Sequence, residues 1–458
     1  MTTGRYQAYP AYEDSAGKWF GRLPSHWKAA PIKFQCTYND EVLSETLNDD
    51  YEIEYVDIGS VSASEGIKKV EQMPFVKAPS RARRVVRDGD VIVSTVRTYL
   101  EAIAPINCPP DNLVVSTGFA VIRPKSILHK KYAAYALRAK GFIEEVVARS
   151  VGISYPAINA SDLVAIYSPV PGLEEQVQIA NFLDHETAKI DTLIDKQQQL
   201  IKLLKEKRQA VISHAVTKGL NPDAPMKDSG VEWLGEVPVH WKIWKFGHFA
   251  PIITCGIAST PEYVDESEGM PFLSAQNNRG NCLSLHKYNY ISKGLHEQLT
   301  RYRKPELGDI LVTRVGAGIG AACVVDTNME FSIYVSLTHI RVNPEIAVNK
   351  FIMYFFGSDY CHFLNHQGTV TGGGVGNLNV NNVVRYKIPL PSVDEQNDIV
   401  NYLDSISLQF ENVIKKTENL IALGKERRTA LISAAVTGKI DVRNWQPAQY
   451  IIPMEVSA

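Results

Sequence analysis

The stretch KEKRQAVISHAVT at residues 205–217 occurs again, slightly changed, as KERRTALISAAVT at residues 425–437. The two copies are 220 residues apart. A second pair of segments, PVPGLEEQ at 169–176 and PLPSVDEQ at 389–396, has the same offset. Because no gap separates the two segments within either copy, the repeat predicts a long helix that occurs twice. The chain is therefore expected to consist of two similar halves.

A third repeated segment precedes each half. WFGRLPSHW at 19–27 returns as WLGEVPVHW at 233–241, with an offset of 214 residues. Large apolar residues that recur in this way usually pack inward, so the paired tryptophans are predicted to be buried. The start of the chain resembles the segment after the first long helix, so the repeat is cyclic and the two termini should lie near each other.

Each long helix carries one apolar seam. Its members are spaced alternately four and three residues apart, which is typical of a coiled coil. They include Ile190, Ile194, Ile201 and Leu204 in the first helix and Phe410, Ile414 and Ile421 in the second. Leu193, Leu200, Val413 and Leu420 are expected to widen the seam. Neither helix can bury this stripe alone, so the two are predicted to pair antiparallel, with a globular domain at each end.

An arginine falls on the seam of each helix, Arg208 in the first and Arg428 in the second. Two interpretations remain open at this stage. The arginines pair with carboxylates across the helix pair, or the seam opens there and they face a partner subunit.

Two variable blocks, residues 28–167 and 242–387, fill the space between the repeated segments. Short apolar runs after a glycine and an aspartate, GDVIVSTV at 89–96 and GDILVTRV at 308–315, predict matching strands. Helices are expected near residues 131–137 and 350–356. The loops that close the blocks, 149–159 and 368–379, are rich in small residues. This composition suits close approach to a ligand as well as it suits a plain flexible loop.

No catalytic motif is found in the sequence. The segment GAGIG at 316–320 lacks the pattern of a nucleotide-binding loop, and NCPPD at 107–111 does not match an adenine methyltransferase motif. The six cysteines suggest neither disulfides nor a cysteine-rich zinc site. Cys361, His362 and His366 supply too few ligands for a usual zinc site, so no metal is expected. Neither a membrane span nor a signal peptide is predicted, which favours a cytoplasmic protein.

Taken together, the repeated segments resemble the specificity subunit of a type I restriction-modification enzyme. The resemblance rests on the two W-x-G-x-x-P-x-H-W segments and on the beginnings and ends of the two helices, and it covers nearly the whole chain. It implies an α+β fold in which two similar target recognition domains are separated by a pair of long antiparallel coiled-coil helices, with pseudo-two-fold cyclic duplication. The expected segments are a leading segment (1–27), the first recognition domain (28–168), the first long helix (169–217), a linker (218–241), the second recognition domain (242–388), the second long helix (389–442) and a C-terminal tail (443–458).

The resemblance also implies a function. Each recognition domain would read one half of a bipartite asymmetric DNA site, and the helices would set the spacer and dock the modification subunits. The expected partners are double-stranded DNA, two modification (methyltransferase) subunits and restriction (translocase/nuclease) subunits. The chain itself would be non-catalytic and hold no cofactor, since S-adenosylmethionine and ATP with Mg²⁺ are expected in the partner subunits.

The family motifs do not identify DNA contacts, so candidates come from local charge. The net charge is −2, but basic residues gather in residues 65–100 and again in 276–304. Phosphate binding depends on such local fields more than on net charge. The candidates are Arg81, Arg83, Arg84, Arg97, Thr98 and Tyr99 in the first block and Gln276, Asn277, Asn278, Arg279, Arg301, Arg303, Lys304 and Arg314 in the second.

Two other classes of function compete with DNA recognition. One is a nuclease or methyltransferase that acts alone, which the missing motifs argue against. The other is a coiled-coil scaffold that binds only proteins and has no sequence-specific DNA readout.

Overall fold

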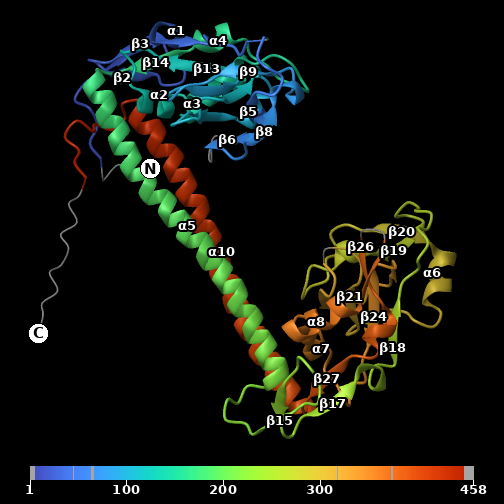
Figure 1. Ribbon diagram of the computed structural model, residues 1–458. Coiled ribbons are helices and arrows are strands. Elements are labelled where there is room, and N and C mark those ends of the chain that lie inside the picture. Colours follow the sequence, from blue (N-terminus) through green and yellow to red (C-terminus); the bar gives the residue numbers. More distant parts are fainter. Residues whose placement is uncertain (1–5, 45, 63–65, 317, 373–374, 448–458) are drawn as a thin grey trace, which may run out of the picture. The chain divides into compact units, whose positions relative to one another are not determined.

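The two longest elements of the chain are helices, α5 (Leu173–Lys218) and α10 (Val393–Val436), and they lie side by side (Figure 1). The computed structural model describes residues 6–44, 46–62, 66–316, 318–372 and 375–447. Contacts divide the chain into two units, residues 1–197 with 419–458 and residues 198–418. Each unit holds one recognition domain and one half of each long helix.

The helices pair antiparallel, as predicted. In the first unit, Ile190 and Ile194 of α5 share a buried cluster with Leu431 near the end of α10. In the second unit, the end of α5 packs on the start of α10, where Ile212 joins a cluster with Leu403. The first half of each helix therefore packs on the second half of the other.

The seam is narrower than expected. Ile190, Ile194 and Phe410 are buried, whereas Ile201, Leu204, Ile414 and Ile421 are only half-buried. The flanking residues that were expected to widen the seam, Leu193, Leu200, Val413 and Leu420, are exposed. That part of the prediction is wrong, because a pair of helices covers only the narrow a/d stripe and leaves the neighbouring positions open.

The seam arginines pair with carboxylates across the helix pair, which decides between the two interpretations. In the first unit, Arg428 Nε of α10 lies 2.9 Å from Asp191 Oδ1 of α5. In the second unit, Arg208 Nη1 of α5 lies 3.7 Å from Glu411 Oε1 of α10. The Arg428 pair is shorter and less exposed, so it should be the stronger of the two.

A double-mutant cycle tests this difference. Combining Arg428→Met with Asp191→Asn should give a coupling energy of about 0.5–1 kcal/mol, as for partly exposed ion pairs. The same cycle with Arg208→Met and Glu411→Gln should give a smaller coupling, because that pair is longer and more exposed. Both values are measured from urea unfolding of the full chain and should fall in high salt. Equal couplings would contradict the ranking.

The first unit contains two four-stranded sheets. Their strand orders are β11-β10-β13-β4 and β8-β5-β12-β9, and β5 and β12 run parallel. The helical elements of this unit besides α5 and α10 are α1 (Ile32–Gln35), η1 (Ile58–Ser60), η2 (Phe75–Lys77), η3 (Thr98–Leu100), α2 (Lys130–Ala136), α3 (Lys140–Arg149) and α4 (Ala160–Val164). Its strands are β1 (Tyr12–Asp14), β2 (Arg22–Pro24), β3 (Lys28–Pro31), β4 (Cys36–Tyr38), β5 (Glu52–Val56), β6 (Val61–Ser62), β7 (Gly66–Ile67), β8 (Glu71–Pro74), β9 (Ala82–Val85), β10 (Val91–Ser94), β11 (Ile103–Pro105), β12 (Leu113–Ser116), β13 (Phe119–Pro124) and β14 (Tyr167–Val170).

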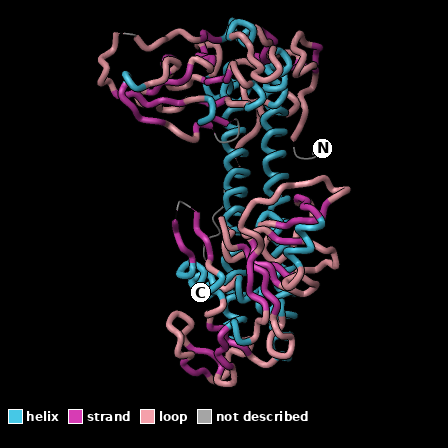
Figure 2. The backbone as a smooth tube through the Cα atoms, turned by 90° about the vertical axis from the view of Figure 1, so that its right-hand side faces the viewer, coloured by secondary structure: helices cyan, strands magenta, loops and turns pink. Residues whose placement is uncertain are grey.

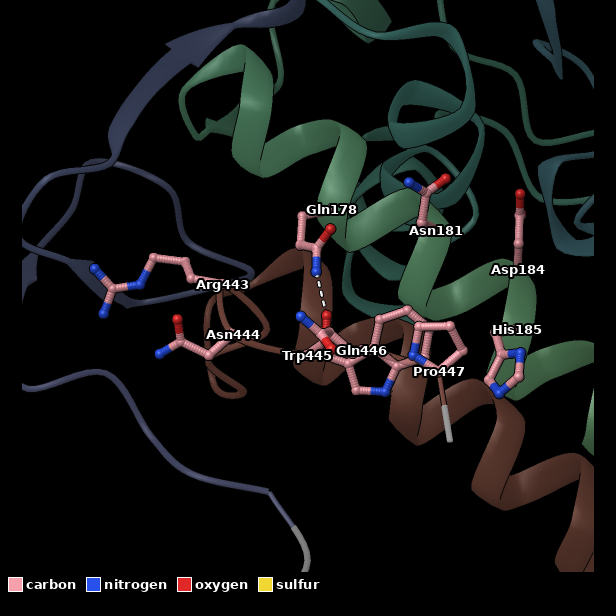
Figure 3. Close-up of a pocket in the computed structure, with 9 residues that line it drawn as sticks. All are labelled: Gln178, Asn181, Asp184, His185, Arg443, Asn444, Trp445, Gln446 and Pro447. Atoms are coloured by element: carbon pink, nitrogen blue, oxygen red, sulfur yellow. Dashed lines mark hydrogen bonds between the residues drawn. The ribbon is translucent and has the colours of Figure 1, made fainter. Parts of the chain in front are cut away.

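The two described ends of the chain meet in the first unit, as the cyclic repeat predicts. The backbone N–H of Asp441 donates to the carbonyl oxygen of Gln7 at 2.8 Å. Beyond this bond, Trp445 packs on Phe182 of α5, with ring centroids 5.3 Å apart. Gln178 donates to the Trp445 carbonyl oxygen and lines a shallow pocket beside this C-terminal segment (Figure 3). This C-terminal segment therefore contacts both α5 and the N-terminal residues and holds them together.

The second unit repeats the plan. One sheet has the order β18-β24-β21-β22, and a second has the order β20-β19-β23 with β19 and β23 parallel. The helical elements of this unit are η4 (Phe246–His248), η5 (Ala275–Asn277), α6 (Lys293–Thr300), α7 (Asn349–Phe356), α8 (Asp359–Gly368) and α9 (Val380–Val383). The strands are β15 (Met226–Asp228), β16 (Glu236–Pro238), β17 (Lys242–Lys245), β18 (Ile252–Cys255), β19 (Gly269–Leu273), β20 (Asn289–Ser292), β21 (Ile310–Thr313), β22 (Ala322–Val324), β23 (Ser332–Ile333), β24 (Leu337–Arg341), β25 (Thr369–Gly372), β26 (Val375–Leu378) and β27 (Lys387–Leu390).

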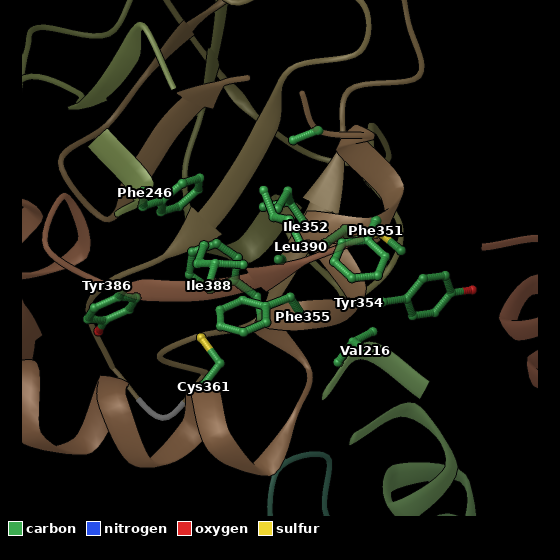
Figure 4. Packing of buried hydrophobic residues seen from close by; sticks show 14 of the residues in the cluster. Val216, Phe246, Phe351, Ile352, Tyr354, Phe355, Cys361, Tyr386, Ile388 and Leu390 are labelled. Atoms are coloured by element: carbon green, nitrogen blue, oxygen red, sulfur yellow. The ribbon is translucent and has the colours of Figure 1, made fainter. Parts of the chain in front are cut away.

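The strands and helices predicted inside the blocks are present. β10 and β21 fall within the two runs that begin with glycine and aspartate, and α2 and α7 fall at the two expected helices. Most strands of each unit belong to its recognition domain (Figure 2), whereas β1 and β2 in the first unit and β15 and β16 in the second lie in the residues that precede the domain. In the second domain, Phe351 and Phe355 of α7 pack together with Ile388 and with Val216 from the end of α5 (Figure 4).

The recurring glutamine at the start of each long helix fastens that helix to its recognition domain. Gln176 accepts a hydrogen bond from the backbone N–H of His129 at 2.7 Å and donates to the carbonyl oxygens of Ile127 and Pro171. Gln396 makes the same three bonds, to Val348, Ile346 and Pro391. Both side chains are fully buried, and their use of every polar atom explains why the residue occurs in both copies.

The glutamate that precedes this glutamine contacts the histidine of the repeated W-x-G-x-x-P-x-H-W segment in both units. His26 Nε2 lies 3.0 Å from Glu175, and His240 Nε2 lies 2.8 Å from Glu395. In the second unit, Trp241 also donates to Glu395 at 3.0 Å. Ser392 accepts the backbone N–H of Glu395, which is one half of a capping box, while the Glu395 carboxylate contacts His240 instead of the Ser392 backbone.

The prediction of inward-facing tryptophans holds for three of the four residues. Trp27 and Trp241 are buried, and Trp19 is half-buried and donates to the carbonyl oxygen of Tyr167. Trp233 is 68% exposed and has a left-handed backbone with φ of 69°. This conformation lays its ring on the surface against Phe363, with centroids 4.7 Å apart.

The aspartate before each central strand holds an arginine from the neighbouring strand. Arg123 donates to both carboxylate oxygens of Asp90, at 2.9 and 2.8 Å. Arg341 binds Asp309 in the same way, with both distances at 2.8 Å. These bidentate pairs tie β13 to β10 and β24 to β21. Among the described helices, none combines the length and apolar character needed to cross a membrane.

Candidate nucleic-acid interface

At one end of each recognition domain, loops are connected by backbone hydrogen bonds where the central strand ends. In the first domain, the backbone N–H of Thr95, just after β10, donates to the Gly118 carbonyl oxygen at 2.8 Å. The carbonyl oxygen of Thr95 accepts the N–H of Ile158 at 2.9 Å, and Val96 forms a bridge with Ala157. We call this region the loop end of the first domain; it comprises residues 95–101, 116–118 and 150–158.

The second domain has the same loop end. The N–H of Arg314, after β21, donates to the Ser336 carbonyl oxygen at 3.0 Å, and the Arg314 carbonyl oxygen accepts the N–H of Leu378 at 2.8 Å. Val315 forms a bridge with Asn377. The segment GAGIG continues from this point as a turn, apart from residue 317, which lies outside the described residues. The closing loop here is the hairpin β25–β26, whose residues 373–374 are also not described.

The arginines of the first domain are mostly free of carboxylates. Within the described part of the chain, Arg81, Arg83, Arg84 and Arg97 form no ion pair, whereas nearby Arg87 is paired with Glu41 at 2.6 Å. Arg81 is exposed. Its carbonyl oxygen accepts the N–H of Thr117, which places Arg81 beside the loop end. Unpaired exposed guanidinium groups are available to phosphates or base edges.

Arg83 and Arg84 are more enclosed. The Arg83 guanidinium lies over the Phe75 ring, 4.9 Å from its centroid. Arg84 is half-buried, its Nε has no hydrogen-bond partner among the described residues, and burial lowers the pKa of its guanidinium. Both are in β9, an edge strand of its sheet.

Arg97, Thr98 and Tyr99 are adjacent but differ in environment. Arg97 is exposed and its guanidinium lies 4.9 Å from the centroid of the Tyr155 ring. Tyr99 is exposed as well. Thr98 is buried, and its hydroxyl donates to the Ser150 hydroxyl at 2.8 Å. Thr98 therefore joins the two loops and has no free group to offer.

Three candidates of the second domain are buried and bonded inside it. Asn277 donates to the carbonyl oxygens of Ser284 and Lys287, both at 2.9 Å. Asn278 donates to Leu311 and Ala321, and Arg314 donates to Leu378 and Asn377. These side chains support the loops. We do not place them among the groups that face DNA.

The other candidates of the second domain lie at its surface. Gln276 and Arg279 are exposed on the loop that follows β19. Arg301 is exposed and stacks on Tyr302, while Arg303 donates to Thr254 on the edge strand β18. Lys304 is already paired with Glu330.

The closing loop of the first domain is predicted from the sequence as a segment suited to ligand approach, but no single residue within it is predicted to make a contact. The structure exposes Val151, Ile153 and Tyr155 there. A signal was present in the sequence, because Val151, Ile153 and Tyr155 alternate with Gly152 and Ser154. Large apolar groups that gather on the surface of a protein usually mark a binding site.

Metal ligands do not gather in the described parts of the chain, since no group of three or more His, Cys, Asp or Glu residues is placed to hold a metal ion there. Cys361 points into the core of the second domain (Figure 4), where burial raises the pKa of its thiol. The pocket of Figure 3 lies beside the C-terminal segment and contains none of the DNA-binding candidates.

The duplicated loop ends and the paired helices define a protein with two modules that present different side chains from the same frame. The family model described as type I restriction modification DNA specificity domain matches the chain twice, at residues 38–203 and 238–421. The chain belongs to this family. It is a DNA-recognition subunit of the type I restriction-modification class, and a role as a scaffold without DNA readout is not favoured.

Relatives extend over nearly the full chain. The putative type I restriction enzyme MjaX specificity subunit of Methanocaldococcus jannaschii is 25% identical and covers 92% of this chain and 96% of its own length. The EcoKI specificity subunit of Escherichia coli is 22% identical, over 92% of this chain and 90% of the relative.

Two solved structures share the fold. A chain from a structure concerned with complex assembly and conformational transition of the type I R-M system has a TM-score of 0.70 at 24% identity, covering 90% of this chain and 98% of that one. The crystal structure of the HsdS subunit from Thermoanaerobacter tengcongensis has a TM-score of 0.51 at 23% identity, covering 91% and 98%.

Proposed function

We propose that each recognition domain reads one half of a bipartite asymmetric DNA site and that the paired helices set the spacer between the halves. One observation carries the proposal. The two loop ends have the same backbone hydrogen bonds but different side chains and closing loops, as expected of one frame that reads two different sequences. A duplicated fold whose two domains read different sequences recognises an asymmetric target.

The available side chains suit the two kinds of DNA contact. Arginine and lysine bind phosphates and position a protein on the duplex, whereas arginine, asparagine and glutamine can read base edges in the major groove. Among the described residues, the exposed candidates that retain free donors are Arg81, Arg97, Tyr99, Gln276, Arg279, Arg301 and Arg303. This support concerns chemistry, and the individual contacts remain part of the proposal.

The helices offer a surface for the modification subunits. α5 exposes Leu193, Leu200 and Leu203, and α10 exposes Leu408, Leu420 and Leu423. Repeated exposed leucines on helices that are already paired fit association with further helices of a partner. In the proposed complex, two modification subunits supply S-adenosylmethionine chemistry and restriction subunits supply ATP and Mg²⁺ chemistry, while this chain is non-catalytic.

A domain exchange tests the proposal. Replacing residues 28–167 by the corresponding block of another specificity subunit should change one half of the methylated site and leave the other half and the spacer unchanged. The measurement is methylation-sensitive sequencing of a host genome that carries the subunit together with its partners. The matched control exchanges residues 242–387 and should change only the opposite half.

Other outcomes count against the proposal in distinct ways. Changes in both halves after one exchange would contradict the modular assignment. Methylation by the purified subunit with S-adenosylmethionine alone would contradict its non-catalytic role. An assembled complex that prefers no duplex sequence would restore the scaffold interpretation.

A further inference from the structure

Arg97 has a backbone conformation that residues with a side chain rarely adopt. Its φ is 51°, in the left-handed region, and Glu101 at the other end of the short helix η3 also has a φ of 51°. Glycine tolerates this region without steric penalty, whereas other residues do not. An arginine at this position therefore has a cost in conformational free energy. A functional role of its side chain would account for its presence there.

The second domain shows the same position without that cost. The backbone bonds of Thr95 and Val96 match those of Arg314 and Val315, so Arg97 corresponds to Gly316. Gly316 has a φ of 93°, also left-handed. The frame of the loop end thus requires a positive φ in both domains. Only the first domain places a long cationic side chain there.

The Arg97 side chain is held in place at the surface. Its guanidinium stacks on Tyr155, which is itself 65% exposed. The two loops that carry this pair are joined by the Thr98–Ser150 hydroxyl bond and by the bridge between Val96 and Ala157. Stacking fixes the plane of the guanidinium but leaves its N–H groups free, and no carboxylate of the described residues pairs with it.

The surroundings suit a DNA groove. Arg81 adds a second unpaired cation, because its backbone carbonyl oxygen accepts the N–H of Thr117 and so holds the residue beside the loop end. Exposed Tyr99, Val151 and Ile153 supply apolar contact area. Glu101 is the acidic side chain within the loop end, and a carboxylate can accept a hydrogen bond from cytosine N4. A cationic, aromatic and apolar set of this kind fits base edges better than it fits a solvated protein surface.

We propose that Arg97 is a specificity-determining residue of the first recognition domain and that it reads a guanine. Its planar guanidinium, oriented by Tyr155, donates to O6 and N7 of the base in the major groove. Lysine lacks the planar fork that stacks on an aromatic ring and donates two parallel hydrogen bonds. The inference rests on the DNA-recognition function proposed above. Gly316 leaves the corresponding place in the second domain to other side chains.

The test uses Arg97→Gly and Arg97→Lys in the full chain, assembled with its partner subunits in a host. Wild-type methylation sequencing first identifies both half-sites. With Arg97→Gly, discrimination at one guanine–cytosine pair of the first half-site should fall by about 10- to 100-fold. The second half-site and the spacer should stay unchanged, and Arg97→Lys should show a similar loss.

Protein stability separates this role from a structural one. Because glycine suits the left-handed backbone, the melting temperature of Arg97→Gly should equal or exceed that of the wild type. Arg87→Lys serves as the matched control, since Arg87 is an exposed arginine of the same domain, at the opposite end of β10, and is paired with Glu41. It should leave both half-sites as they are.

Each remaining outcome overturns a different statement. An unchanged motif in Arg97→Gly overturns the assignment to Arg97 while the proposed function stands, and so does a first half-site without a guanine–cytosine pair. Loss of methylation at both half-sites in a folded variant identifies a protein-docking role instead. A wild type without a bipartite motif overturns the proposed function itself.

Discussion

Replacing Asp309 by asparagine should lower the free energy of unfolding of the second recognition domain by about 3 kcal/mol. Asp309 is buried, and its carboxylate accepts two hydrogen bonds from Arg341, one from the N–H of Glu306 and one from His339 at 2.7 Å. Asparagine keeps the volume but removes the charge, which leaves the exposed Glu306, at 3.1 Å, as the remaining described carboxylate partner of Arg341. Urea unfolding of the full chain measures the loss.

The matched control is Glu306→Gln. Glu306 also lies near Arg341, at 3.1 Å, but its side chain is 59% exposed. Exposed pairs of this kind contribute less than about 1 kcal/mol, so this variant should unfold almost like the wild type. If both variants lost the same stability, the buried position of Asp309 would not be the cause.

Acid should remove the contribution of Asp309 in the wild type. Burial alone would raise the pKa of the carboxyl, but hydrogen bonds from Arg341 and His339 outweigh it and hold the pKa below its ordinary value. A carboxyl with a lowered pKa stabilises the fold above its ordinary pKa and loses this effect as the pH falls through the folded value. The difference between wild type and Asp309→Asn should be full at pH 7 and shrink below about pH 4. A difference that stayed constant down to pH 2 would contradict the linkage.

Replacing Trp241 by alanine should cost about 3–5 kcal/mol. Trp241 is fully buried. Its ring packs edge-on against that of Phe351, with ring centroids 6.4 Å apart, and its ring N–H donates to Glu395. Truncation would leave a large cavity between the leading segment and the start of α10, and it would remove a hydrogen bond from a carboxylate. The expected fall in melting temperature is about 6–15 °C, measured on the full chain.

Trp233 provides the control from the same motif. Its ring is mostly exposed and packs on Phe363. Trp233→Ala should therefore cost no more than about 1 kcal/mol. Comparable losses for the two tryptophans would mean that the motif acts as one unit and that burial does not rank its members.

Repeated residues made the framework predictable. The helix starts, the strands after the paired aspartates and the antiparallel helix pair all follow from segments that occur twice, and the structure contains each of them. The repeat also singled out Gln176 and Gln396, although their bonds became visible only in the fold. The width of the seam was overestimated, because apolar spacing alone does not say how far a partner helix reaches.

The candidate DNA contacts could be predicted only in part. Charge patterning singled out Arg97 and Arg314 alike, yet Arg97 is exposed and Arg314 is buried against Leu378. The apolar side chains of the closing loop were passed over, since alternation over five residues in a loop rich in small residues does not distinguish a contact surface from a flexible link.

The sequence by itself determined the duplication, the two long helices and the family, because these depend on residue types at fixed spacings along the chain. The tertiary structure decided which side chains of the loop ends face outward. That choice depends on hydrogen bonds between segments that are far apart in sequence, such as Thr98 with Ser150 and Arg314 with Asn377. Only folding brings these segments together, and it leaves Arg97 on Tyr155 at the surface.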